Sequence, residues 1–117
     1  MTNNRLQNYL RTYRRRHGFS QSEIALLLGV SSETKVSRYE SFRRHPAVFT
    51  VFAFEIIFNT PARELFAGSY DLIRRDVRKR ASRLIKMLEA GAKHAHTLRK
   101  LQLLRTIVES EPNAADK

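Results

Sequence analysis

Side chains that could perform catalysis or bind a metal ion are few in this sequence and are not grouped. The chain has no cysteine, and two of its four histidines, His94 and His96, fall on different faces of a helix. There is no glycine-rich phosphate loop, and the candidate nucleophilic serines stand at expected helix caps rather than beside a general base. We therefore expect no enzyme, no metal site and no cofactor.

The chemistry that the sequence does supply is positive charge. It contains 22 Lys and Arg residues against 11 Asp and Glu, a net charge of +11 over 117 residues. This balance is typical of proteins that bind polyanions, which makes nucleic acid the leading partner. The N-terminal residues lack the apolar run of a signal peptide, and Thr50 and Glu55 interrupt the most apolar stretch. We expect a cytoplasmic protein, associated with the nucleoid through DNA binding, and no membrane contact.

These charges must be positioned by helices. Apolar residues recur at spacings of three and four, with few prolines and glycines between them, so the predicted fold class is all-α. The first helix should end at His17-Gly18, and Ser20 with Glu23 has the pattern of a capping box for a second helix that ends at Gly29. The apolar face of the first helix is expected to comprise Leu6, Leu10 and Tyr13.

A third helix should begin after Ser31-Ser32 and end between Phe42 and His45. Pro46 and Pro61 suit the first turns of a fourth helix and of a short fifth helix. Gly68 is expected to end this half of the chain.

From Ser69 onward the composition changes to few aromatic residues and many basic ones. The spacing of the apolar residues predicts a long amphipathic helix, which Gly91 separates from a last helix. Residues 74 to 105 include 11 Lys and Arg residues but only two acidic residues, Asp76 and Glu89. We favour a basic hairpin that dimerises and whose outer side contacts phosphates; a solvated helix face and a membrane-surface helix are the alternatives. The expected packing residues are Ile73, Val77, Leu84, Leu88, Leu98 and Leu101.

Several short segments agree in order and spacing with one known pattern. They are Tyr13 to Ala25, Gly29 to Ser31, Val36 to Glu40, Arg43 to Pro46 and Glu64 to Phe66. Together they resemble the XRE, or phage-repressor-like, helix-turn-helix family, over about the first 66 residues. The resemblance implies a five-helix domain that places one helix in the major groove of double-stranded DNA. The predicted organisation is a DNA-binding domain at 1–66, a C-terminal helical extension at 67–110 and a frayed tail at 111–117.

Two features depart from the family pattern. Gly29 precedes Val36 by seven positions where the family usually has six, so one residue is inserted, and we place it within Ser31 to Glu33. Phe42 stands where the family often has a glycine, so either the helix runs on or the loop bends differently.

On this register the resemblance assigns five residues of the third helix to base edges or beside them: Glu33, Thr34, Lys35, Ser37 and Arg38. Arg can donate two hydrogen bonds to guanine, Glu can accept one from cytosine, and the Thr methyl can contact thymine. In the alternative interpretation Glu33 only interacts with the helix dipole and Thr34 only caps the helix.

The resemblance also assigns some residues to phosphate contact and others to the structure of the domain. Gln21, Arg43 and Arg44 fall beside the phosphate backbone; for the two arginines a solvated loop is the alternative. Arg14 and Glu40 match positions that form an ion pair between the first helix and the recognition helix; two exposed charges are the alternative.

The fourth helix, Ala47 to Phe58, is apolar around nearly its whole circumference. The family pattern places polar residues where Phe49, Ala53 and Ile56 stand. We expect these three to contact the C-terminal helices or a second subunit, with overlarge core packing as the alternative.

The sequence therefore predicts a sequence-specific, double-stranded DNA-binding transcriptional regulator, a repressor acting as a homodimer on an inverted repeat. The alternative function is a protein-interaction module, such as an antitoxin or an adaptor with an unknown protein partner, in which the helix-turn-helix is secondary.

Overall fold

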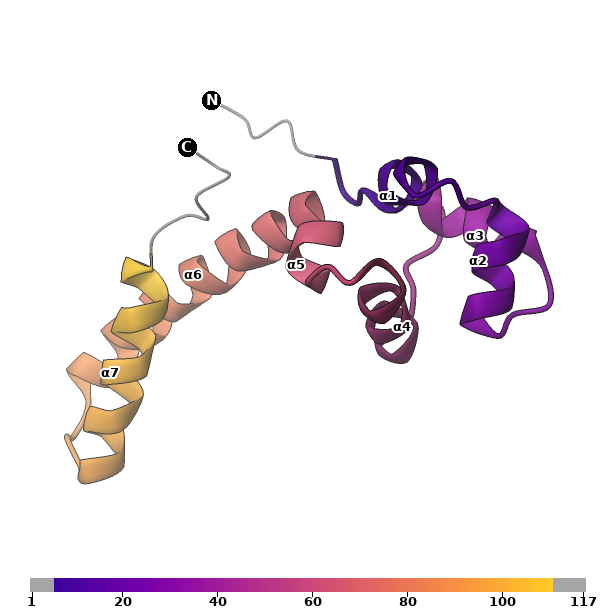
Figure 1. The fold of residues 1–117 in the computed structure, drawn as a ribbon. Helices are drawn as coiled ribbons and strands as arrows, with labels where there is room; N and C mark the ends of the chain where they lie inside the picture. Colours follow the sequence, from indigo (N-terminus) through magenta and orange to yellow (C-terminus); the bar gives the residue numbers. More distant parts are fainter. Residues whose placement is uncertain (1–5, 111–117) are drawn as a thin grey trace. The chain divides into compact units, whose positions relative to one another are not determined.

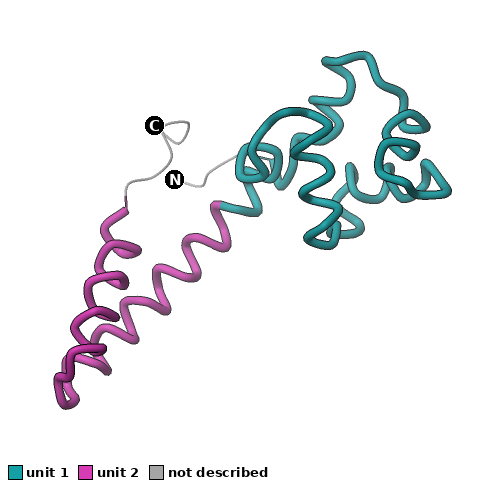
Figure 2. The backbone as a smooth tube through the Cα atoms, turned by 60° about the horizontal axis from the view of Figure 1, so that its bottom comes forward, with its two compact units in different colours: residues 1–70 teal, residues 71–117 magenta. Residues whose placement is uncertain are grey.

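The computed structural model describes residues 6–110, so the tail expected at 111–117 lies outside the described residues. It confirms the all-α class (Figure 1). The chain divides into two compact units, Met1–Tyr70 and Asp71–Lys117 (Figure 2), and the division falls inside a helix. The helices are α1 (Leu10–Arg16), α2 (Gln21–Leu28), α3 (Glu33–Glu40), α4 (Val48–Phe58), α5 (Ala62–Leu65), α6 (Ala67–Ala90) and α7 (Ala95–Glu109).

The boundaries of α2 follow from local sequence as predicted. The Ser20 hydroxyl accepts a hydrogen bond from the Glu23 backbone N–H at 3.0 Å, and the Glu23 carboxylate accepts one from the Ser20 N–H at 2.8 Å. This capping box satisfies backbone donors at the start of the helix. At the other end Gly29 has φ 74°, the left-handed conformation that glycine adopts without strain.

The first helix is shorter than predicted, because Leu6 lies outside it and is 48% exposed. The cause is the buried side chain of Asn8. Its Oδ1 accepts from the Leu10 N–H at 3.1 Å, and its Nδ2 donates to the Tyr39 carbonyl at 2.9 Å. Asn8 thus satisfies the N–H of the first residue of α1 and ties that end of the helix to the end of α3.

The prediction that Gly68 ends the first half is wrong, because Gly68 lies in the first turn of α6. The first N–H groups of a helix have no partner within it. Here the Gly68 N–H donates to the Leu6 carbonyl at 2.8 Å, and the Ser69 N–H donates to the Gln7 carbonyl at 3.3 Å. The Leu6 and Gln7 carbonyls therefore satisfy the start of α6, and these bonds join residues more than 60 positions apart that no local sequence pattern connects.

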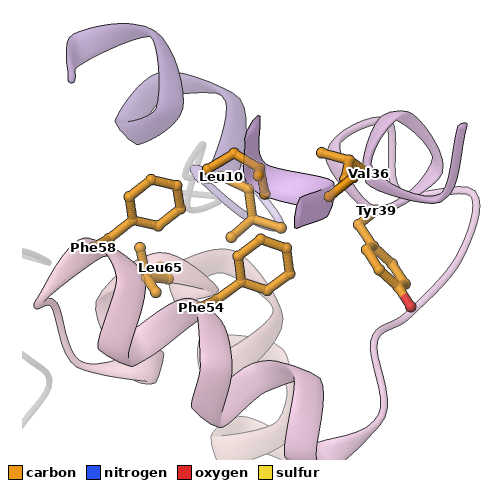
Figure 3. Close-up of a cluster of buried hydrophobic side chains, with 8 residues drawn as sticks. Leu10, Val36, Tyr39, Phe54, Phe58 and Leu65 are labelled. Atoms are coloured by element: carbon orange, nitrogen blue, oxygen red, sulfur yellow. The ribbon is translucent and has the colours of Figure 1, made fainter. Parts of the chain in front are cut away.

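The core of unit 1 is built where α1 to α5 converge (Figure 3). Phe54 of α4 is at its centre, with its ring edge-on to Tyr39 at a centroid distance of 6.0 Å and stacked with Phe58 at 6.2 Å. Such pairs add to the burial of apolar area, which is the main force holding a small domain together. The fully buried side chains of this unit are Leu10, Ile24, Val36, Phe54 and Leu65.

Unit 2 is a helical hairpin of α6 and α7. The helix break predicted at Gly91 is confirmed, since α6 ends at Ala90. The hairpin buries Ala81, Thr97 and Leu101 between its two helices. At its open end the Arg78 guanidinium donates to the Val108 carbonyl at 2.7 Å and so satisfies a carbonyl in the last turn of α7.

Candidate nucleic-acid interface

The turn between α2 and α3 sets the register of α3. The Ser32 hydroxyl accepts from the Thr34 N–H at 3.0 Å, so Ser32 is the N-cap and α3 begins at Glu33. Val36 is completely buried and Tyr39 is 6% exposed. The longer turn is thus absorbed before Glu33, and the core residues of α3 fall on the register that the sequence predicts.

The opposite face of α3 is polar and exposed. It presents Thr34, Ser37 and Arg38. Ser37 and Arg38 follow Thr34 by three and four positions, so both lie next to it on the helix surface. Glu33 is also exposed at the helix start, whereas Lys35 is half-buried beside Val36. Four of the five residues assigned to base edges are thus available on the surface, and Lys35 is the least accessible.

Glu33 has a partner that the sequence did not reveal. The Ser22 hydroxyl of α2 donates to Glu33 Oε2 at 2.6 Å. This bond spans the turn, and no local pattern connects residues 11 positions apart. It fixes one carboxylate oxygen, while Oε1 keeps acceptor capacity toward solvent.

Arg14 and Glu40 form a buried ion pair. The Arg14 Nε and Nη2 groups donate to the two Glu40 carboxylate oxygens at 2.6 and 3.2 Å, and the side chains are 11% and 5% exposed. Arg14 Nη1 also donates to the Phe19 carbonyl at 3.0 Å. The planar fork of Arg matches a carboxylate in this two-bond geometry, so the pair joins α1, the following loop and the end of α3.

Gln21 belongs to the same network. Its Nε2 donates to Glu40 Oε1 at 3.1 Å. The amide group has two N–H donors, so one remains for a phosphate at the start of α2. Gln21 therefore links the predicted phosphate contact to the ion pair that holds α3.

The loop after α3 bends back sharply instead of extending the helix. Phe42 has φ 68°, a conformation that L-residues other than glycine rarely adopt. The N–H groups of Arg43 and Arg44 both donate to the Arg38 carbonyl, at 3.0 and 3.3 Å. Both arginine side chains are exposed.

The expected packing residues divide into buried and exposed sets. On α4, Phe49 and Ile56 are 80% and 79% exposed and Ala53 is half-buried, so unit 1 leaves this face of α4 uncovered. In unit 2 the hairpin buries Leu101 and half-buries Leu88. The other expected packing residues stay exposed: Ile73, Val77, Leu84 and Leu98.

Residues 6–110 contain no group of three His, Cys, Asp or Glu side chains able to hold a metal ion. The prediction that His94 and His96 lie on different faces of a helix is wrong, because His94 is the N-cap of α7 and the two rings stack with centroids 5.6 Å apart. None of the described helices is long and apolar enough to cross a membrane.

The sequence pattern of the helix-turn-helix family matches residues 10–65. Comparisons with curated proteins and with solved structures gave no match. The matched span begins at the first residue of α1 and ends at the last residue of α5, so α6 and α7 lie outside it. The match spans residues 10–65, just under half of the chain, and supports an XRE-type, DNA-binding helix-turn-helix domain over that span.

Proposed function

We propose that this protein is a sequence-specific transcriptional regulator that binds double-stranded DNA, a repressor acting as a homodimer on an inverted-repeat operator. The observation that carries the proposal is the two-sided character of α3. Val36 and Tyr39 seal one face into the core, and Thr34, Ser37 and Arg38 leave a polar face free to enter a major groove.

Base recognition follows from the donors and acceptors on that face. Arg38 offers two N–H groups to the O6 and N7 atoms of guanine, and the Thr34 methyl group offers an apolar contact to thymine. Because Ser22 holds Glu33 Oε2, the other carboxylate oxygen is directed as an acceptor for the amino group of cytosine. Ser22 is then a positioning residue for the readout by Glu33.

Affinity comes from charge. Arg43 and Arg44 are exposed in the loop after α3, and the whole chain carries a net charge of +11. Contacts of this kind to phosphate release counterions and strengthen binding to every DNA sequence alike. They fix the orientation of α3 without carrying sequence information.

The proposed homodimer interface is the outer face of the hairpin. Ile73, Val77, Leu84 and Met87 are 62%, 41%, 40% and 69% exposed, and their spacing follows the alternating four- and three-residue steps of a coiled-coil seam, with Arg80 at the intervening position. A two-fold axis through this seam presents one recognition helix to each half of an inverted repeat. Occupation of such a site would suffice to block a promoter.

A second function, a protein-interaction module, is favoured by one observation. Phe49 and Ile56 on α4 are both about four-fifths exposed, at 80% and 79%, and exposed aromatic and aliphatic side chains close together mark protein contacts. On that account the variant Phe49→Ser abolishes partner capture and DNA binding is incidental.

Selection of bound duplexes from a random pool by the full-length protein tests the main proposal. An enriched inverted repeat with half-sites about one helical turn apart is the expected result. Sedimentation on that duplex should give two protein chains per site. A pool without any enriched sequence would instead support the interaction module.

A further inference from the structure

The hairpin of unit 2 has little core of its own. Of residues 71–110, the side chains that are buried between its helices are Ala81, Thr97 and Leu101. A helical unit of this size usually needs a disulfide, a metal ion or a second chain to become stable, and the sequence contains no cysteine. A second copy of the hairpin is therefore the simplest cover for the apolar side chains that α6 leaves exposed.

The exposed stripe of α6 is self-complementary. Four of its positions follow one another at steps of four, three and four residues: Ile73, Val77, Arg80 and Leu84. This is the spacing of a coiled-coil seam, and it is the same from either end. Two antiparallel copies of α6 can therefore pair Ile73 with Leu84 and Val77 with Arg80, each pair occurring twice. In a parallel pair the two Arg80 side chains would lie at the same level, where their charges repel.

The charges along one edge of this seam favour the antiparallel arrangement. Asp76 precedes Arg80 by four positions and Arg83 by seven, so the three exposed side chains form one row on the helix. Asp76 has no ion-pair partner among residues 6–110. In an antiparallel pair this edge of each helix faces the same edge of the other copy. The row then offers each Asp76 two positive partners across the interface.

The charges also select one register. When Ile73 lies opposite Leu84, the two-fold axis passes between residues 78 and 79 of α6. Asp76 of one copy is then level with a point between Arg80 and Arg83 of the other, within about two residue rises, or ~3 Å, of each along the helix.

The alternative antiparallel register pairs Val77 with Met87. It brings Asp76 level with Leu88, away from both arginines, and it moves Ile73 opposite Gly91, beyond the last residue of α6. The apolar pattern and the charge pattern of α6 therefore agree on the register that pairs Ile73 with Leu84.

We infer that two copies of this chain pair through α6 in antiparallel orientation, with Asp76 of each copy held between Arg80 and Arg83 of the other. This inference rests on the proposed function, because it specifies the interface of the proposed homodimer. Ala67, the first residue of α6, lies about 11 to 12 residues before the two-fold axis. The two α6 helices therefore begin roughly 35 Å apart, which is the spacing of successive major grooves on one side of DNA.

Disulfide cross-linking tests the orientation, because the sequence has no cysteine of its own. Full-length chains with Ile73→Cys and with Leu84→Cys, one of them tagged to change its size, are oxidised separately and as a mixture. The mixture should give a cross-linked heterodimer. Neither variant alone should cross-link, since the two copies of residue 73 lie about 11 residues, or roughly 16 Å, apart along the seam.

A charge exchange tests the ion pairs. Asp76→Arg leaves only positive charges in the row, and the double variant Arg80→Asp with Arg83→Asp leaves only negative ones. Each protein alone should have a dimer Kd raised by about tenfold or more, and mixing the two should restore dimers of one chain of each kind. Lys79→Asp is the matched control, because this exposed residue lies about 100° from Arg80 around the helix and outside the seam. It should leave the Kd unchanged in sedimentation equilibrium.

Cross-linking of Ile73→Cys alone would overturn the inference, because it requires a parallel pair. A wild-type dimer whose cysteine mixture does not cross-link would also overturn it and would move the interface away from α6. In both cases an inverted repeat could still be enriched from the random pool, so the proposed function would stand. A monomeric wild-type protein would contradict the inference and the proposed homodimer together, whereas a pool without an enriched sequence counts against DNA recognition alone.

Discussion

Removal of Glu40 is expected to be among the most destabilising single changes in this chain. The variant Glu40→Ala deletes the acceptor of three hydrogen bonds, two from Arg14 and one from Gln21. It leaves the Arg14 guanidinium, 11% exposed in the native state, with the Phe19 carbonyl as its remaining partner. An uncompensated buried charge of this kind costs about 3–5 kcal/mol.

That cost is a large share of the total stability of a small domain, which is about 5–15 kcal/mol. At about 4 °C per kcal/mol, the Tm of unit 1 should fall by roughly 12 °C or more. Thermal melts followed by circular dichroism at 222 nm measure the shift, and urea titration converts it to a free energy of unfolding.

The chain supplies a matched control in unit 2. Glu89 accepts a bond of 2.7 Å from Arg105, but the two side chains are 45% and 49% exposed. Glu89→Ala should therefore cost about 0–1 kcal/mol. In the double variant Arg14→Met with Glu40→Leu no charge is left buried, so part of the lost stability should return. Equal, small effects of Glu40→Ala and Glu89→Ala would refute the reasoning.

Three further predictions concern capping, phosphate contact and assembly. Ser20→Ala should lower the free energy of unfolding by about 1 kcal/mol, because the capping box of α2 is lost; a melt unchanged from wild type would contradict this. Arg43→Ala should weaken binding to all duplexes alike and reduce the slope of log K against log salt by about 1, measured by fluorescence anisotropy. A fragment ending at Tyr70 should stay helical but sediment as a monomer and bind an inverted repeat weakly; a dimeric fragment would move the interface to unit 1.

Much of the fold could be predicted because the relevant signals are local. A capping box is recognised from two residues three positions apart, and a helix end from a single glycine. The capping box of Ser20 and Glu23 and the helix ends at Gly29 and Gly91 are therefore predicted correctly. The buried positions of α3 also follow from helical spacing once the longer turn is placed before Glu33.

The wrong predictions of helix bounds concern segments that are far apart in the sequence but hydrogen-bond to each other in the fold. Gly68 is typical of a helix end, but the Leu6 carbonyl accepts its N–H and the helix begins there instead. Asn8 shortens α1 through a bond to the Tyr39 carbonyl 31 positions away. The bond between Ser22 and Glu33 has the same character, since it exists only when the turn brings α2 and α3 together.

Side-chain exposure was the other quantity that spacing could not resolve. The apolar stripe of α6 and α7 predicted one packing surface, but the hairpin buries Leu101 and leaves Ile73 and Leu98 exposed. Helical periodicity identifies which residues share a stripe, and it does not say which edge of a wide stripe the neighbouring helix covers. Only the structure therefore shows which apolar residues of the stripe lie between the two helices and which stay exposed.

The most direct test of the central claim replaces single guanines of the selected duplex by 7-deazaguanine, which removes the N7 acceptor from the major groove and leaves the minor groove intact. Arg38 needs that acceptor for its two-bond contact, so one guanine in each half-site should lose about 1–3 kcal/mol of binding when replaced. The same replacement should have no effect on the Arg38→Ala variant. Equal losses in the wild type and in Arg38→Ala, or no sensitive guanine in the selected site, would contradict the assignment of α3 as the recognition helix led by Arg38.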